Sequence, residues 1–327
     1  MIEKRITDTQ LKNIVNFPLG QKKGLRIVFM GTPEFAVASL EKLVNEGYNI
    51  ACVVTGPDKP GGRGMRLQQS AVKKYAEEKG LNILQPEKLR NPEFLDALKD
   101  LNADVQIVVA FRMLPEMVWN MPPMGTINVH GSLLPQYRGA APINWAIING
   151  EKITGVTTFK LQQQIDTGDI LLSEKIDIRD DETAGELHDE MKEIGASLLL
   201  KTIKALENGS LAEQPQPVST ELKHAPKIFT ETCQINFSKS VDEIYNLIRG
   251  LSPFPAAFTF LEGKKLKIFK AEKIYTSPSI ATGNFETDKK TLLQFACSDG
   301  FIKLLELQLE GKKKMNTEDF LRGYKFI

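Results

Sequence analysis

Cysteine is scarce in this sequence. Cys52, Cys233 and Cys297 are its three cysteines, and they are odd in number, far apart and free of any CxxC spacing. A disulfide framework needs an even set and a thiolate metal site needs close pairs, so neither is indicated. The pattern fits a reducing cytoplasm, and we expect no metal.

Long hydrophobic runs and a strong charge of one sign are also missing. No segment approaches the roughly 20 apolar residues of a membrane helix, and the N-terminus lacks a hydrophobic core followed by a small-residue cleavage site. We therefore expect a soluble protein that is not exported. A net charge of +1 and a pI near 7.6 exclude a uniformly basic nucleic-acid binder but leave room for a local basic face.

The length and composition predict two domains, because 327 residues with 42% hydrophobic content can form a core in each. Residues 1–23 are polar and precede the first strand, so we interpret them as an N-terminal extension of unknown purpose. A first domain then covers residues 24–210. Residues 211–228 carry three prolines and no periodicity, which is typical of a linker, and residues 229–327 form the second domain.

The first domain alternates apolar runs with amphipathic stretches. The runs are predicted strands, at Leu25 to Met30, Asn49 to Thr55, Asp104 to Ala110, Gly125 to His130, Gly155 to Leu161 and Asp169 to Ile178. The amphipathic stretches predict helices after Gly31-Thr32-Pro33, at Ala71 to Lys79, Pro92 to Leu101 and Thr183 to Asn208. Thr32 suits an N-cap and Pro33 the first helical position. The alternation predicts an α/β fold with a Rossmann-like, mostly parallel sheet, whose ligands bind beyond the carboxyl ends of the strands.

The second domain has a different pattern. A helix is expected at Val241 to Leu251, followed by short strands at near-regular spacing. We predict a small β-barrel, similar to an OB-fold.

The candidate chemistry lies in Asn128-Val129-His130, at the carboxyl end of a predicted strand. Residues two apart on a strand project from the same face, so an amide donor and a titratable ring lie side by side. The alternative is that His130 only ties a strand end to a loop. His188 and His224 lie among polar residues, and we assign both to the solvated surface.

At this point the sequence is recognisable. The sequence resembles the folate-dependent formyltransferase family, and within it the branch that formylates methionyl-tRNA. The segments that carry this resemblance are INVHGSLLPQYRGAAPINWAI, GVTTFKLQQQIDTGDILL, RIVFMGTPEFA, PDKPGGRG and HAPKI. The likeness extends from about Leu25 to near the C-terminus. It implies a cytoplasmic, metal-free enzyme, and a monomer is adequate for this architecture. The implied reaction moves the formyl group of 10-formyltetrahydrofolate onto the methionine amino group of initiator methionyl-tRNA, without a covalent enzyme intermediate.

The resemblance also implies roles for individual residues. The catalytic set is Asn128, His130 and Asp166, with Asn128 and His130 stabilising the developing oxyanion and Asp166 orienting the imidazole. The implied folate site comprises Ser132, Leu133, Leu134 and Pro135, with an apolar wall at Phe111, Met113 and Leu114. Taken alone, Asp166 before Thr167-Gly168 is better explained as a turn-capping residue, and Asp169 is then the alternative acid.

A tRNA partner is indicated by the segment from Thr55 to Ser70, which holds four glycines, two prolines and three cations. We predict a mobile basic loop in which Arg63, Lys59 and Arg66 contact tRNA; the alternative is a solvated loop without a partner. Residues 214–327 hold 17 Lys and Arg against 13 Asp and Glu, a net charge of +4. Their lysines, Lys264, Lys265, Lys267, Lys270 and Lys312 to Lys314, form either a phosphate-facing surface or protection for a strand edge.

Four competing functions remain at this level. A formyltransferase acting on an amino sugar also carries a second domain, whereas one acting on glycinamide ribonucleotide needs only the first. A 10-formyltetrahydrofolate hydrolase has an N-terminal regulatory domain that 23 residues do not supply. From another class, a tRNA-binding or nucleotide-binding module has no need of the Asn, His and Asp set.

Overall fold

The computed structural model describes residues 24–61, 66–218 and 221–326, so the N-terminal extension and Arg63 lie outside the described residues. Contacts between Cα atoms divide the chain into two compact units, each discontinuous in sequence. The first unit holds residues 24–135, Val156–Glu174 and Met191–Val218. The second unit holds Gln136–Gly155, Lys175–Glu190 and the residues from 221 onward. The predicted linear boundaries at residues 210 and 228 stay a prediction.

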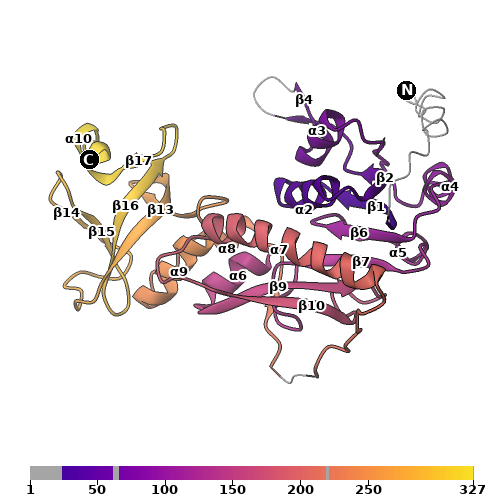
Figure 1. Ribbon diagram of the computed structural model, residues 1–327. Helices are drawn as coiled ribbons and strands as arrows, with labels where there is room; N and C mark the ends of the chain where they lie inside the picture. Colours follow the sequence, from indigo (N-terminus) through magenta and orange to yellow (C-terminus); the bar gives the residue numbers. More distant parts are fainter. Residues whose placement is uncertain (1–23, 62–65, 219–220, 327) are drawn as a thin grey trace. The chain divides into compact units, whose positions relative to one another are not determined.

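A seven-stranded sheet with the order β10-β9-β7-β6-β1-β2-β5 organises the first unit (Figure 1). The strands are β1 (Arg26–Gly31), β2 (Asn49–Val54), β5 (Ile83–Leu84), β6 (Val105–Val109), β7 (Thr126–His130), β9 (Ile153–Lys160) and β10 (Ile170–Asp177). The pairs among β1, β2, β5, β6 and β7 are parallel, and β9 runs antiparallel to β7. The predicted α/β fold with a mostly parallel sheet is confirmed.

Helices cover this sheet because each buries an apolar stripe. They are α2 (Glu34–Asn45), α3 (Ala71–Glu78), α4 (Pro92–Asp100), α5 (Glu116–Trp119) and α7 (Ala184–Glu207). Val28 and Met30 are two residues apart on β1 and so lie on one face of the sheet, where both pack in a core with Leu98 of α4 and Val118 of α5. The helices predicted from periodicity therefore exist within a residue or two of the expected bounds.

The start of α2 differs from the prediction. Pro33 has an extended backbone, with φ −80° and ψ 175°, and is itself the N-cap. Glu34 is the first helical residue, and no side chain caps the helix. The prediction of Thr32 as cap was wrong by one position, because proline's fixed φ is compatible with either site.

The second unit contains an antiparallel sheet with the order β12-β13-β16-β15-β14, and β17 pairs with β16. Its strands are β12 (Ala257–Leu261), β13 (Lys264–Ile274), β14 (Phe285–Thr287), β15 (Leu293–Ala296), β16 (Phe301–Leu309) and β17 (Met315–Asn316). Register shifts near Lys270 in β13 bend the sheet into an OB-like half-barrel (Figure 1). Its core is closed by α9 (Val241–Leu251), which starts at a capping box of Ser240 and Glu243.

Several short elements were not predicted. They are β3 (Lys59–Gly61), β4 (Arg66–Gln68), β5, α5, β8 (Arg138–Gly139), α6 (Pro142–Ile148), β11 (His224–Ala225), α8 (Thr230–Cys233), β14, β17 and α10 (Thr317–Gly323). β8 and β11 pair in parallel, so part of the segment interpreted as linker belongs to a ribbon. A Cβ on Gly139 would lie 2.4 Å from the Ala225 carbonyl oxygen, so this close approach requires glycine.

Candidate active site

Asn128 and His130 lie at the carboxyl end of β7, in the interior of the sheet. Asn128 is in register with Val108 of β6 and Phe159 of β9, and His130 is opposite Thr157. Neighbouring strands on both sides fix the backbone of β7, and the two-residue spacing directs both side chains to one face. The side chains of Asn128 and His130, predicted from the sequence to share one face, are therefore held by a strand inside the sheet.

Asp166 lies close to His130. The His130 Nδ1 atom is 3.8 Å from the Asp166 Oδ2 atom, and the two side chains are 7% and 11% exposed. At this separation and burial the Asp166 carboxylate restricts the orientation of the imidazole. The Phe159 ring meets His130 edge to face, with 6.4 Å between ring centres. This contact confines the imidazole on a second side.

The amide of Asn128 has an unused hydrogen-bonding end. Its Oδ1 atom is buried and accepts no hydrogen bond from any described residue. Exchanging oxygen and nitrogen by turning the amide still leaves one end free, and a buried polar group without a partner is costly. A ligand that supplies a complementary polar atom would remove this cost. This is the observation that best fits the site to a bound substrate.

The turn carrying Asp166 is held in an uncommon backbone conformation. Asp166 has a φ of +52°, which few non-glycine residues adopt, and such residues concentrate at functional sites. The Gln216 Nε2 atom donates hydrogen bonds to the carbonyl oxygens of both Asp166 and Gly168, each at 2.8 Å. A Cβ on Gly168 would lie 1.6 Å from the Lys160 carbonyl oxygen, so the turn requires glycine there.

Gln216 was missed in the sequence, where it stands between two prolines in a stretch without periodicity. No local signal marks it, because its partners lie 50 and 48 residues away. Asp169, the alternative acid, instead accepts a backbone hydrogen bond from Lys160 through its own carbonyl oxygen. The carboxylate that faces His130 is that of Asp166.

Replacing Gln216 with methionine should lower kcat for the reaction catalysed at this site about tenfold while leaving KM nearly unchanged, because two hydrogen bonds to the Asp166 turn are lost. Steady-state kinetics check this. Gln214→Met is the matched control, since Gln214 is exposed and contributes through its backbone, which pairs with Ile170. Equal activity of both variants and wild type would contradict a positioning role for Gln216.

The loop after His130 holds the residues predicted to line a folate site. The Thr157 hydroxyl donates to the Ser132 carbonyl oxygen at 2.7 Å and accepts from the Leu134 N–H at 3.2 Å. Ser132 and Leu134 are buried, and Leu133 is half-buried. Thr157, which was not predicted, thus connects this loop to β9 directly opposite His130.

The other predicted wall residues follow β6. Leu114 is buried in the core between the sheet and α5, and Phe111 packs against that core. Met113 is 72% exposed. Their assignment to folate binding, like that of the Ser132 to Pro135 loop, stays a prediction.

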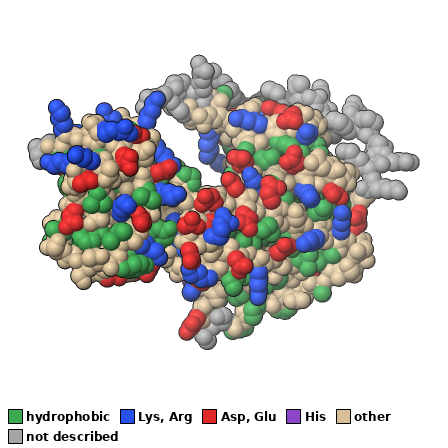
Figure 2. Space-filling view, turned by 60° about the vertical axis from the view of Figure 1, so that its left-hand side comes forward, with side chains coloured by type: hydrophobic (Ala, Val, Ile, Leu, Met, Phe, Trp, Pro, Cys, Tyr) green, Lys and Arg blue, Asp and Glu red, His purple; other side chains and the backbone are tan. Residues whose placement is uncertain are grey.

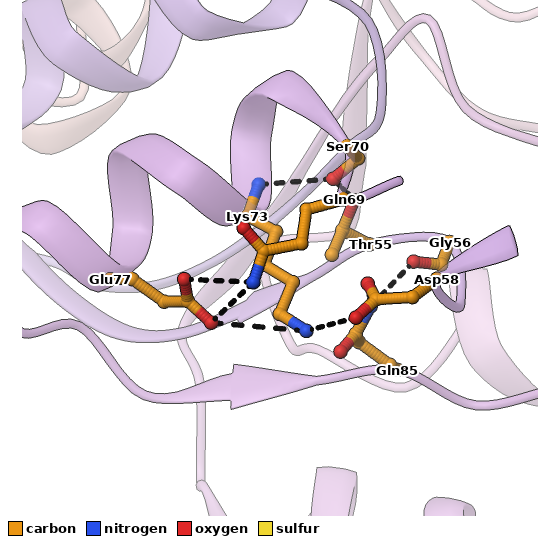
Figure 3. A network of polar contacts seen from close by, with 8 residues as sticks. All are labelled: Thr55, Gly56, Asp58, Gln69, Ser70, Lys73, Glu77 and Gln85. Atoms are coloured by element: carbon orange, nitrogen blue, oxygen red, sulfur yellow. Dashed lines mark hydrogen bonds and ion pairs between the residues drawn. The ribbon is translucent and has the colours of Figure 1, made fainter. Parts of the chain in front are cut away.

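The base of the predicted basic loop is tied down by a polar network (Figure 3). The Lys73 Nζ atom is 2.6 Å from the Asp58 Oδ2 atom, and Gln85 donates to Asp58 and to the Gly56 carbonyl oxygen. The hydrogen bond from Lys73 lowers the pKa of Asp58 below its usual range. Asp58 directly precedes Lys59, where β3 pairs with β4. The described ends of this segment are therefore a short ladder, which the interpretation as an irregular loop missed.

Among the described residues, no group of three or more His, Cys, Asp and Glu side chains is arranged to hold a metal ion. Within the same part of the chain, no helix combines the length and the apolar character needed to cross a bilayer.

The chain is similar to known proteins in its family matches, its sequence and its fold. Residues 25–203 match the family described as formyl transferase, and residues 227–325 match the formyl transferase C-terminal domain. A methionyl-tRNA formyltransferase of Bacteroides thetaiotaomicron is 50% identical over 313 residues, covering 93% of this chain and 97% of that protein. The protein of the same name from Phocaeicola vulgatus is 55% identical over 315 residues, with coverage of 93% and 97%.

Two solved structures share the fold. An N-formyltransferase from Helicobacter canadensis, in complex with folinic acid and dTDP-3-aminofucose, has a TM-score of 0.63 at 22% identity, covering 89% of this chain and all of that one. HypX from Aquifex aeolicus, in complex with tetrahydrofolic acid, has a TM-score of 0.63 at 18% identity, covering 93% of this chain and 49% of that one. At these identities the likeness concerns the fold.

Proposed function

The chain belongs to the formyltransferase family, and from this premise we propose that it formylates the free amino group of methionine on initiator methionyl-tRNA. The donor is 10-formyltetrahydrofolate, and the product supports translation initiation. One observation carries the proposal: His130 lies 3.8 Å from Asp166, and Asn128, whose buried Oδ1 atom has no partner among the described residues, lies two residues from His130 on β7.

The proposed catalytic residues stabilise the charge on the formyl oxygen and accept the proton of the attacking ammonium group. When the amine attacks the formyl carbon, negative charge builds on the formyl oxygen, and the Asn128 amide and the His130 imidazole stabilise it by hydrogen bonding. Asp166 orients the imidazole. The same carboxylate is a suitable acceptor for the proton that leaves the attacking ammonium group, directly or through water. No covalent bond to the enzyme is needed.

The donor supplies the formyl carbon when it is bound. The loop of Ser132, Leu133, Leu134 and Pro135 adjoins the catalytic strand, and Thr157 fixes its course, so it is placed to bind the folate close to His130. The apolar side chains of this loop suit an aromatic ring system. Phe111, Met113 and Leu114 complete the proposed set.

The acceptor is assigned from the relatives' names and from charge. We propose that Lys59, Arg63 and Arg66 contact the tRNA, and that the lysines of the second unit contribute further phosphate contacts. Figure 2 shows Lys and Arg side chains gathered on the left-hand part of the surface in view. Phosphate contacts of this kind need charge more than base-specific groups. The three cysteines are buried and free, which fits the proposed cytoplasmic monomer.

Replacing Lys73 with methionine should raise KM for tRNA about fivefold with kcat nearly unchanged, because a charge-assisted hydrogen bond to Asp58 at the base of the basic segment is lost. Steady-state kinetics with varied tRNA concentration check this. Lys73→Arg keeps the charge and should restore most of the affinity, and Lys74→Met removes an exposed lysine one position along. A rise in KM of the same size in Lys74→Met would show that general charge, not the Asp58 contact, is responsible.

The function is tested by transfer of labelled formyl from 10-formyltetrahydrofolate to methionyl initiator tRNA, with an amino-sugar nucleotide as competing acceptor. Formylated tRNA from the wild-type protein supports the proposal. Formylation of the sugar alone would keep the catalytic residues and overturn the acceptor. Absence of transfer to either, with tRNA binding retained, would favour a binding module.

A further inference from the structure

The second unit contains a cavity that none of the proposed catalytic residues lines. Its volume is about 460 Å³, within the range of small-ligand sites. Its walls come from three segments: residues 140–144 at the start of α6, residues 227–233 leading into α8, and residues 254–267 around β12 and the start of β13. Two of these three segments lie within residues 214–327, which carry a net charge of +4.

Three phenylalanine rings line this cavity. Phe254 is 82% exposed and Phe229 is 58% exposed, whereas Phe258 is buried in the core beneath. Large exposed aromatic side chains at one concave site leave apolar area in water that a bound partner would cover. Their flat faces suit another flat ring.

Three lysines line the same cavity. Lys265 lies over the Phe258 ring, with its Nζ atom 4.1 Å from the ring centre, and Lys227 lies over Phe229 at 5.6 Å. Lys267 donates a hydrogen bond to the Pro255 carbonyl oxygen at 3.2 Å. Among the described residues, none of the three forms an ion pair with a carboxylate. Their charge is available to an anion from outside the unit.

We propose that this cavity binds one unpaired nucleotide of the RNA substrate, with the base stacked on Phe229 and Phe254 and the backbone phosphate at Lys227, Lys265 and Lys267. The inference rests on the proposed function, because that function makes RNA the acceptor. Stacking on aromatic rings combined with lysine contacts to phosphate is how single-stranded nucleic acid is bound without sequence selection. An acidic peptide would use the lysines but would have no need of the exposed rings.

The double variant Phe229→Leu, Phe254→Leu tests the stacking. Leucine keeps apolar volume but removes the ring, so tRNA affinity in a filter-binding titration should fall about tenfold. The matched variant Phe229→Tyr, Phe254→Tyr keeps both rings and should bind within about twofold of wild type. Unchanged affinity of the leucine variant would overturn the proposal, and so would an equal loss in both variants.

The lysine contribution is tested through salt dependence. Lys227→Met should reduce the slope of log affinity against log salt by about 0.7, the value for one phosphate contact to a single strand. Lys290→Met removes an exposed lysine outside the cavity, in the connection between β14 and β15, and should reduce the slope less. Equal slopes in the two variants would contradict a phosphate at Lys227.

A titration with adenosine monophosphate distinguishes a nucleotide of the RNA from a free nucleotide as the ligand of the cavity. Loss of its binding in the leucine variant, together with unchanged tRNA affinity, would assign the cavity to free nucleotides and overturn the proposal. These measurements report RNA affinity and not transfer. If the wild-type protein binds tRNA but does not formylate it, the proposed function alone is overturned. If the enzyme is active and its leucine variant binds tRNA normally, the cavity proposal alone is overturned.

Discussion

Replacing His130 with alanine should lower kcat for formyl transfer by about 10²- to 10⁴-fold, the usual contribution of a positioned acid or base. The loss is expected in kcat, because the imidazole stabilises charge that appears as the amine attacks. It stands 3.8 Å from Asp166 and is almost fully buried, so bulk water does not replace it. Single-turnover transfer of labelled formyl to methionyl-tRNA measures the effect without a contribution from product release.

The chain offers two matched controls for this substitution, because it has two further histidines. His188 is partly exposed on α7 beside Asp189, and His224 is exposed on β11. His188→Ala and His224→Ala should each retain activity within about twofold of wild type, as is usual for surface changes. Retention of full activity by His130→Ala, with normal folate binding, would assign the histidine to loop anchoring, which is the alternative left open by the sequence.

Replacing Asn128 with alanine should lower kcat by about 10²- to 10³-fold, the measured range for removing one donor from an oxyanion site. The Asn128 amide is built into β7 between β6 and β9, so it needs no reorganisation during the reaction. The free enzyme should not lose stability, since the Oδ1 atom accepts no hydrogen bond from the described residues. Thermal unfolding and single-turnover kinetics together check both expectations.

Asn128→Asp sharpens this test, because the carboxylate has nearly the same shape but no amide donor. It also adds a negative charge near Asp166, so its kcat should fall at least as far as that of the alanine variant. Asn102→Ala, at an exposed position, is the control. Near-normal kcat in Asn128→Asp would show that no donor is needed at this position.

The elements predicted well are those whose stabilising interactions lie close together in sequence and those whose residues are buried on both faces. Val241 to Leu251 was predicted as a helix and forms one with the same bounds, because its apolar stripe lies within the segment and its N-cap, Ser240, directly precedes it. β6 was predicted within a residue or two because all five of its residues are buried on both faces. Short elements such as β8 and β11 depend on each other across a long stretch of chain, so neither has a signal of its own.

The same distinction applies to the site. Asn128 and His130 were predicted as neighbours from spacing on one strand, and the structure places them so. The approach of Asp166 to His130 followed only from the resemblance, since the sequence taken alone favoured a turn-capping role. Gln216, Thr157 and Lys73 were missed because each acts through hydrogen bonds to residues distant in sequence, and side-chain type does not reveal such partners.

The hydrogen bonds from Gln216 have a consequence for how the protein is made. Gln216 follows Asp166 by 50 residues, so a nascent chain leaves the ribosome with the Asp166 turn long before the side chain that holds it. A fragment ending at residue 210 would contain every proposed catalytic residue and still lack this side chain. We therefore expect the catalytic turn to mature late in synthesis, after β7 and β9 have paired and after most of the first unit has emerged.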